Sequence, residues 1–418
     1  MKKIFQKFIL GVLFFPLSAL TVKAKGEVEV LHWWTSGGEA AGLAVIKDNV
    51  EKKGVTWKDM PIAGGAGTNA MTVLRSRVAA GQPPTAVQLL GFDITDWAKE
   101  GVLGDLNVIA KAGNWDTVVP QALQKFAKYE GKWISVPVNV HSTNWVWANK
   151  AIFDKLKIGP LKSWADFEKA VNKLKAAGIT PIAHGGQPWQ DTTVFEAIVL
   201  GLDNGVTYKK AFIDLDPAAQ TSKEMVKAFE RLRFVAQNLD PSFSGRDWNL
   251  ATSMIINGTA GMQMMGDWAK GEFGKANKVA NKDFLCFRFP GTQGLVTFNA
   301  DQFAMFKVDA EKAEAQKILA EVVMDKAVQA QFNQLKGSVP ARMDIGNEGF
   351  DACGVKGMKD LKEASQKNTL FGSVAHGYAV PANLKNAIFD AVTAYFNDSA
   401  KTAAQGADDL ALAIKNAK

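Results

Sequence analysis

Apolar and polar positions follow two different periods along the first hundred residues. Runs of period two, such as the one in which Val28 and Val30 alternate with polar neighbours, predict strands, and apolar residues three or four apart predict helices. Strands are predicted over residues 28–34, 55–62 and 86–90, and helices over 40–52, 69–80 and 93–100. Strands that alternate with helices are typical of an α/β lobe with a largely parallel sheet.

The same alternation continues beyond residue 140. Ser163 is a residue type that often caps helices, and apolar side chains from Trp164 to Leu174 follow at helical spacing, so a helix is predicted to residue 177. Further helices are predicted over 189–200, 222–237 and 248–256, and strands over 179–183 and 261–265. This second series predicts a second α/β lobe.

Three extended or broken segments separate these series. They lie at 133–140, 297–307 and 336–340, with a long helix predicted over 310–335 and a helical remainder over 344–418. If each segment crosses between lobes, one lobe comprises residues 25–140 with 298–337 and the other residues 141–297 with 338–418. Three crossings would form a hinge about which the lobes close.

The start of the chain predicts export. Lys2, Lys3 and Lys7 precede a short apolar run, and Val22-Lys23-Ala24 fits a signal peptidase site, so residues 1–24 are interpreted as a signal peptide. A membrane anchor is the alternative, but the run is too short for a bilayer span of about 20 residues. Because no Cys near the cleavage point could take a lipid, we expect a protein free in the periplasm.

Composition narrows the class of protein. Cleavage would remove four lysines and no acid, so the formal net charge falls from +7 to +3, and no clustered Lys/Arg stripe suggests nucleic acid. The length is too great for one core and agrees with two lobes. The only cysteines are Cys286 and Cys353, for which a disulfide and two buried thiols are equally acceptable at this stage.

Signatures of catalysis and of cofactors are missing. The chain has no Gly-x-Ser-x-Gly, His-Glu-x-x-His or Cys-x-x-Cys sequence, and the Gly-rich stretch 63–69 lacks the Lys of a phosphate loop and is interpreted as a turn. Four scattered histidines and two distant cysteines do not suggest a metal site. We therefore expect no cofactor, no metal and no enzyme activity.

Several short sequences, in this order and spacing, resemble the extracellular solute-binding proteins of carbohydrate ABC importers, to which maltose-binding protein is distantly related. They are Val-Glu-Val-Leu-His-Trp-Trp-Thr-Ser-Gly-Gly-Glu at 28–39, the segments 77–88 and 134–139, Ser-Trp-Ala-Asp-Phe at 163–167, Asn-Gly-Thr-Ala-Gly-Met at 257–262, and Gly-Ser-Val-Pro-Ala at 337–341. The resemblance covers essentially the whole mature chain. The tandem Trp33-Trp34 followed by Glu39 is most similar to the glucose- and mannose-binding branch.

This resemblance implies a two-lobed α/β fold of the maltose-binding-protein type, with one sugar bound in the cleft. The expected ligand is a monosaccharide, glucose in the first place and mannose or galactose otherwise. The expected partner is an inner-membrane ABC permease, to which a monomeric receptor delivers the sugar.

A sugar offers apolar C–H faces and a rim of hydroxyl groups, so its site needs flat aromatic rings beside charged and amide groups. Twelve Trp against four Tyr make such rings available. Guided by the resemblance, we expect the site to contain Trp33, Trp34, Glu39, Gln88, Trp268, Asn299, Asp301, Lys336 and His376. His141 either lines the cleft or packs in the hinge.

Each of these residues also has an ordinary structural interpretation. Glu39 could be a helix-start acid, Lys336 a solvated residue at a helix end, and His376 a surface loop residue. Gln88 could bond only to backbone, whereas Trp268 and one of the tandem Trp residues could belong to the core.

Two other functions are compatible with parts of this sequence. A secreted glycoside hydrolase would also be rich in Trp and carboxylates and would need an Asp/Glu pair across the sugar bond, but a rigid site does not suit a hinged layout. A receptor for amino acids would want an Arg for the ligand carboxylate, and none occurs among the candidate residues.

Overall fold

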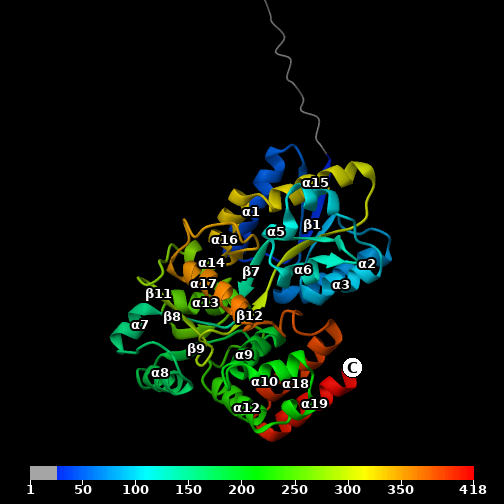
Figure 1. The fold of residues 1–418 in the computed structure, drawn as a ribbon. Helices are drawn as coiled ribbons and strands as arrows, with labels where there is room; N and C mark the ends of the chain where they lie inside the picture. Colours follow the sequence, from blue (N-terminus) through cyan, green and yellow to red (C-terminus); the bar gives the residue numbers. More distant parts are fainter. Residues whose placement is uncertain (1–25) are drawn as a thin grey trace, which may run out of the picture.

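Three sheets organise residues 26–418, the part of the chain that the computed structural model describes (Figure 1). The predicted signal peptide, residues 1–24, lies outside the described residues. Two of the sheets are each packed with their own helices and form the N-terminal and the C-terminal lobe, and a third, the central sheet, lies between them. Within residues 26–418, no helix is both long and apolar enough to cross a membrane.

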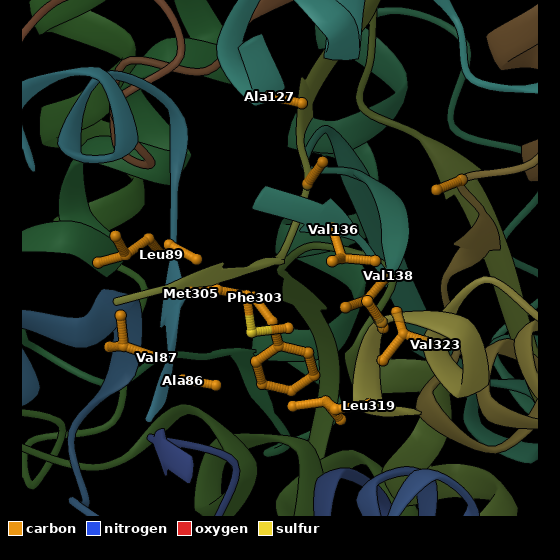
Figure 2. Packing of buried hydrophobic residues seen from close by; sticks show 14 of the residues in the cluster. Ala86, Val87, Leu89, Ala127, Val136, Val138, Phe303, Met305, Leu319 and Val323 are labelled. Carbon is orange, nitrogen blue, oxygen red and sulfur yellow. The ribbon is translucent and has the colours of Figure 1, made fainter. Parts of the chain in front are cut away.

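The N-terminal lobe is built on a five-stranded sheet of order β2-β1-β3-β13-β6. β1 pairs in parallel with β2 and β3, whereas β13 runs antiparallel to β3 and β6, so the sheet is mixed and not largely parallel as predicted. Its strands are β1 (Glu27–His32), β2 (Thr56–Pro61), β3 (Ala86–Leu89), β6 (Ser135–Pro137) and β13 (Gln302–Met305). Its helices are α1 (Gly37–Lys52), α2 (Thr68–Ala79), α3 (Gly91–Lys99), α4 (Asn107–Ala112), α5 (Trp115–Val118), α6 (Gln121–Ala127), α15 (Ala310–Val323) and α16 (Lys326–Lys336). A separate two-stranded sheet consists of β4 (Lys128–Tyr129) and β5 (Lys132–Trp133). Figure 2 shows the core where Phe303 packs among Val87, Val136 and Leu319.

The C-terminal lobe is built on a four-stranded sheet of order β11-β8-β10-β9. Its strands are β8 (Trp145–Asn149), β9 (Thr180–Ala183), β10 (Ala260–Met264) and β11 (Phe284–Arg288). Its helices are α7 (Lys150–Lys155), α8 (Trp164–Ala176), α9 (Pro188–Leu200), α10 (Val206–Tyr208), α11 (Pro217–Gln220), α12 (Lys223–Ala236), α13 (Trp248–Ile256), α14 (Ala269–Lys275), α18 (Ala382–Asn397) and α19 (Ala403–Ala417). Ser163 caps α8 in a capping box with Asp166, which confirms the helix start predicted there.

The central sheet takes one strand from each of the segments that were predicted to cross between lobes. Its order is β14-β7-β12-β15, with β7 (Asn139–Ser142), β12 (Val296–Asn299), β14 (Val339–Pro340) and β15 (Leu370–Gly372), and α17 (Ala352–Gln366) lies between β14 and β15 in sequence. Along the chain, β7 connects β6 of the N-terminal lobe to β8 of the C-terminal lobe. The chain returns through β12, which connects β11 of the C-terminal lobe to β13 of the N-terminal lobe.

The structure differs from the predicted elements in three respects. The first strand ends at His32, so Trp33 and Trp34 lie in the turn that follows it. The single helix predicted over 310–335 is two helices, because the Asp325 side chain caps α16 by accepting from the backbone N–H groups of residues 327 and 328. Strands β8 and β11 were not predicted, since their runs are short and buried and lack a clear alternation.

Cys286 and Cys353 are joined by a disulfide, with their Cα atoms 6.2 Å apart. The bond links β11 at the edge of the C-terminal sheet to α17. Of the two alternatives that the sequence left open, the structure has the disulfide.

Candidate functional site

A cavity of about 230 Å³ opens where the N-terminal lobe, the C-terminal lobe and the central sheet meet. Its wall comes from segments far apart in the chain: the turn after β1, the Gly-rich stretch before α2, the starts of α9 and α13, the residues after β10, the end of α16 and the loop after β15. Eight of the nine predicted site residues are in this wall, namely Trp33, Trp34, Glu39, Trp268, Asn299, Asp301, Lys336 and His376. His141 lines it as well, which is one of the two roles that the sequence left open.

The turn after β1 brings both tandem Trp residues to the cavity. His32 is buried and its Nδ1 accepts from the backbone N–H of Trp34 at 3.2 Å, while Gln88 Oε1 accepts from the backbone N–H of Trp33 at 3.1 Å. Trp34 packs its ring against Phe332. Because the strand has ended, the two rings are not forced to opposite faces of a sheet, and both line the cavity.

Gln88 is the predicted site residue that is absent from the cavity wall. It is fully buried behind it, where its side chain joins the Trp33 backbone to Asp301: Nε2 donates to Asp301 Oδ1 at 2.7 Å. A buried amide that bonds to backbone was the alternative weighed for Gln88, and the structure adds the carboxylate as a second partner.

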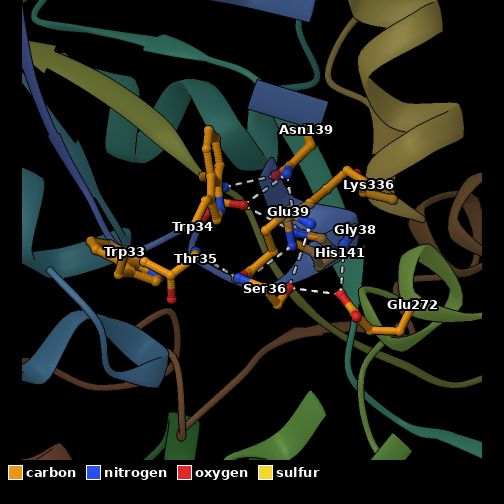
Figure 3. A network of polar contacts seen from close by, with 12 residues as sticks. Trp33, Trp34, Thr35, Ser36, Gly38, Glu39, Asn139, His141, Glu272 and Lys336 are labelled. Atoms are coloured by element: carbon orange, nitrogen blue, oxygen red, sulfur yellow. Dashed lines mark hydrogen bonds and ion pairs between the residues drawn. The ribbon is translucent and has the colours of Figure 1, made fainter. Parts of the chain in front are cut away.

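The start of α1 presents Glu39 to the cavity. Ser36 and Glu39 form a capping box in which Glu39 Oε2 accepts from the backbone N–H of Ser36 at 3.2 Å. Figure 3 shows the other oxygen facing Lys336, whose Nζ lies 3.4 Å from Glu39 Oε1. Lys336 is only 2% exposed, so it is a buried partner of Glu39 and not a solvated residue at a helix end. Glu39 therefore serves both as helix cap and as the partner of a buried cation.

A second carboxylate reaches the same helix start from the other lobe. Glu272 on α14 accepts at Oε1 from Ser36 Oγ and from the backbone N–H of Gly38, both at 2.7 Å (Figure 3). The approach is close: a Cβ added to Gly38 would lie 2.6 Å from the backbone of Gly271. The two lobes are thus in direct contact beside the cavity.

Asp301 is held by three side chains and keeps capacity for one more donor. Oδ1 accepts from Gln88, and Oδ2 accepts from Asn139 Nδ2 at 2.7 Å and from His141 Nε2 at 3.0 Å. A carboxylate has about four acceptor positions. Burial by itself would raise the pKa of Asp301, but the hydrogen bond and charge of His141, with the charge of Lys336, lower it to about 2. The site therefore offers an ionised acceptor to a ligand.

His141 lies between two carboxylates in the central sheet. Its Nδ1 bonds Asp267 and its Nε2 bonds Asp301. Burial and the charge of Lys336 lower the pKa of His141, yet the charge of Asp267 and the two hydrogen bonds outweigh them and raise it above its usual value. His141 therefore joins Asp267, beyond the end of β10, to Asp301, and this position favours its protonated form.

Asn299 carries a buried amide oxygen with no hydrogen-bond partner within residues 26–418. A buried polar atom without a partner costs stability, on the order of 1–3 kcal/mol. Because Asn299 lines the cavity, a donor group on a ligand could satisfy this oxygen.

Aromatic rings gather on the C-terminal side of the cavity. The Trp268 ring centroid lies 5.1 Å from that of His376 and 6.2 Å from that of Trp189. Trp189 also touches the Gly-rich stretch of the other lobe, since a Cβ added to Gly65 would lie 2.5 Å from its ring. These rings form flat apolar surfaces across which the two lobes meet.

Sequence reasoning missed part of this wall. Trp189, Trp248 and the flanking Asp247 and Asn249 line the cavity, as do residues 63–66, which were interpreted only as a turn. A signal was present: α9 and α13 each begin at or next to a Trp, and helix starts gather at the ligand-binding edge of an α/β lobe.

The wall combines the carboxylates of Asp301 and Glu39, the buried Lys336, the amide oxygen of Asn299 that has no partner, and several flat rings. None of the residues that line it is an Arg. Such a set suits an uncharged ligand rich in hydroxyl groups better than an anion. Its volume lies below the range of roughly 300–1,000 Å³ that is usual for drug-sized ligands, which favours a small one. Within residues 26–418, no group of three His, Cys, Asp or Glu side chains is arranged to hold a metal ion.

Comparison with known proteins identifies the family of the chain. The model of the bacterial extracellular solute-binding protein family matches residues 34–329. A protein of Rhizobium meliloti, named probable sugar-binding periplasmic protein, is 58% identical over 402 residues, which cover 96% of this chain and 97% of that protein.

Solved structures share the fold at low identity. The bacterial solute receptor AcbH, described as preferring β-D-galactopyranose, matches with a TM-score of 0.79 at 17% identity, over 94% of this chain and 99% of that one. The maltose-maltodextrin binding protein of Alicyclobacillus acidocaldarius matches with a TM-score of 0.68 at 17% identity, over 93% and 100%. These likenesses confirm the predicted two-lobed, maltose-binding-protein-like fold.

Proposed function

Because the chain belongs to the bacterial extracellular solute-binding protein family, we propose that it is the sugar receptor of an ABC importer. It is a periplasmic protein, as are the relatives that share more than half of its residues. It binds a monosaccharide between its lobes and delivers it, as a monomer, to a permease in the inner membrane. Residues 1–24 serve as the signal peptide that brings it there.

The observation that carries this proposal is the cavity wall. Flat rings at Trp268 and Trp189 suit the C–H faces of a pyranose, and the free acceptor positions of Asp301 and Asn299 suit its hydroxyl groups. The small volume supports a single sugar ring. Glucose is the proposed ligand, with mannose and galactose as alternatives; the relative AcbH is described as preferring galactopyranose.

Binding is proposed to close the lobes about the central sheet. The proposed boundaries, 140/141, 297/298 and 337/338, fall within β7, within β12 and just before β14. A sugar that touches both lobes makes its full set of contacts only in the closed form, so it shifts the population toward that form. The permease would then recognise the closed shape.

The test is calorimetric titration of residues 25–418 with a panel of mono- and disaccharides, followed by chromatography of the recovered sugar. Tight one-to-one binding of one hexose, recovered intact, is the expected result. Absence of binding would contradict a sugar receptor. Recovery of cleaved sugar would instead support the glycoside hydrolase and direct the search to a carboxylate pair.

A further inference from the structure

A chain of three side chains leads from the interior of the C-terminal lobe to the cavity. Glu196, on α9, is fully buried, and its Oε1 and Oε2 lie 2.7 Å and 3.0 Å from Ser373 Oγ. Ser373 Oγ in turn lies 2.8 Å from His376 Nδ1. This is the only hydrogen bond of the His376 ring within residues 26–418, and His376 lines the cavity.

The contacts of Glu196 fix the direction of the hydrogen bonds. Its Oε2 receives the backbone N–H groups of Val374 at 2.7 Å and Ala375 at 3.2 Å, and Thr143 Oγ1 lies 2.9 Å from Oε1. An ionised carboxylate can only accept, so the single hydroxyl proton of Ser373 is directed to Glu196. Ser373 Oγ is then left with lone pairs toward His376, whose Nδ1 must carry the proton.

We propose that Glu196 and Ser373 are positioning residues that hold neutral His376 with its proton on Nδ1, so that Nε2 is a hydrogen-bond acceptor for the ligand. This inference rests on the proposed sugar-binding function and deepens it. The ligand must offer a hydroxyl proton at this place; an ether, deoxy or fluoro group there cannot replace it. His376 would thus select for one free hydroxyl group of the sugar.

The surroundings keep His376 neutral. Burial and the charges of His141 and Lys385 lower the pKa of His376 to about 3, although Asp301 opposes them. Burial raises the pKa of Glu196 to about 7, against the hydrogen bonds that it accepts. Above pH 8 the chain therefore has an ionised carboxylate at one end and a neutral imidazole at the other.

Replacing Glu196 by Gln should reverse the chain. The two backbone N–H groups at Oε2 require the amide oxygen there, which places the amide nitrogen against Ser373 and Thr143. The amide nitrogen then donates to Ser373 Oγ. The amide oxygen lies 3.0 Å from Ser373 Oγ but already accepts the two backbone N–H groups, so the Ser373 proton turns to His376 Nδ1, which is nearer at 2.8 Å. His376 would carry its proton on Nε2 and present a donor to the ligand, with almost no change of shape.

The first experiment is ¹⁵N spectroscopy of histidine-labelled residues 25–418 at pH 9, without sugar, with His376 assigned through His376→Asn. We expect the nitrogen proton on Nδ1 in the wild-type protein and on Nε2 in Glu196→Gln. Asp191→Asn is the matched control: Asp191 is a buried carboxylate on the same helix that bonds His184 and Thr393, away from His376. Its His376 should keep the wild-type tautomer.

An Nε2-bound proton in the wild-type protein, or the same tautomer in wild type and Glu196→Gln, would overturn the proposal. The wild-type spectrum alone decides the first point, so the test survives if the variant does not fold. Because no sugar is needed, this result is independent of whether the protein is a sugar receptor.

The second experiment titrates both proteins with D-glucose and its monodeoxyfluoro analogues, or with those of whichever hexose binds tightest. One fluoro position should weaken wild-type binding about ten- to hundredfold through the donor lost to His376. In Glu196→Gln glucose should bind about tenfold less tightly, and that position should lose most of its penalty. An equal penalty in both proteins would contradict the proposal. No binding of any hexose to wild type would contradict the proposed function and leave the tautomer result standing.

Discussion

Asp301 shows how one residue can be a structural partner and a ligand contact together. Three of its acceptor positions hold Gln88, Asn139 and His141, and its backbone N–H donates to Asn139 Oδ1 at 2.8 Å. The carboxylate is therefore oriented before a ligand arrives, and little side-chain freedom is lost on binding.

We expect Asp301→Asn to weaken hexose binding about hundredfold, or about 2.7 kcal/mol, since a charge-assisted hydrogen bond is lost. Trp33→Ala and Trp34→Ala should each weaken it about tenfold or more through loss of ring contact. Titration calorimetry measures the affinities, and circular dichroism checks that each variant is folded. Unchanged affinity in all three variants would mean that the ligand lies elsewhere.

His141 should make the stability of the protein depend on pH. Its folded-state pKa is raised above 6.5 by Asp267 and Asp301, against burial and the charge of Lys336. A raised pKa of a base stabilises the fold fully below the unfolded value of about 6.5, and this stabilisation is lost as the pH rises through the folded value.

The free energy of unfolding of His141→Asn should therefore lie furthest below wild type near pH 6, by about 3–5 kcal/mol, because the buried carboxylates lose their partner. The difference should shrink toward pH 9. Urea denaturation of both proteins at pH 6, 7.5 and 9 measures it. A difference that stays constant with pH would show that folding does not raise the pKa of His141.

At the scale of elements, the site is assembled from the ends of strands and helices. The turn after β1 and the capping box at the start of α1 place two rings and a carboxylate within seven residues, 33–39. The rigid helix α16 brings Lys336 to the same carboxylate at its C-terminal end. The capped helices α1 and α16 thus position Glu39 and Lys336, whereas the position of the Trp189 and Trp268 rings at the cavity depends on how the lobes pack together.

The disulfide ties β11 to α17 and should matter for stability and not for binding. It joins residues 67 positions apart, and the chain-entropy model gives about 4 kcal/mol for a loop of this length. We expect the double variant with Cys286→Ser and Cys353→Ser to lose about 2–4 kcal/mol of unfolding free energy. Hexose affinity should change less than twofold, since neither residue lines the cavity.

Reductant provides the control for this prediction. It should destabilise the wild-type protein as the double substitution does and leave the double variant unaffected. If reduction had no effect on thermal unfolding of the wild-type protein, the disulfide would not be formed in solution.

At the scale of the whole molecule, the lobes meet at two glycines that lie close to the opposite lobe. Gly38 faces Gly271 beside Glu272, and Gly65 faces Trp189. Each contact joins segments of different lobes and allows no larger side chain at the glycine. If the lobes open about the central sheet, these contacts separate, and they form again around the ligand.

Small-angle scattering should therefore show that the bound hexose compacts the wild-type protein. Gly38→Ala should reduce this compaction and weaken binding about tenfold or more, because its Cβ would lie 2.6 Å from the Gly271 backbone. Gly274→Ala, on the helix α14 that carries Gly271, is the control, since a Cβ at Gly274 meets nothing within 4 Å, and it should behave as wild type. Equal compaction and affinity in all three proteins would argue against closure at this contact.

The sequence by itself determined the features that depend on residues close to one another along the chain. The Ser163 cap, the presence of three strands in the first hundred residues and the succession of two α/β lobes follow from side chains within a few positions of one another, and the structure confirms them. The family resemblance added the site residues, eight of which do line one cavity. The resemblance did not show that Gln88 lies behind the wall. Successive residues of a strand point to opposite faces, and the sequence does not say which face meets the cavity.

Only the tertiary structure decided the contacts between distant segments. The pairing of Cys286 with Cys353, the position of Trp189 against Gly65, and the chain from Glu196 to His376 each join residues tens to hundreds of positions apart. Hydrogen bonds and close packing depend on distances of a few ångströms. Those distances are set when the lobes and the central sheet pack together, and no local pattern of residues encodes them.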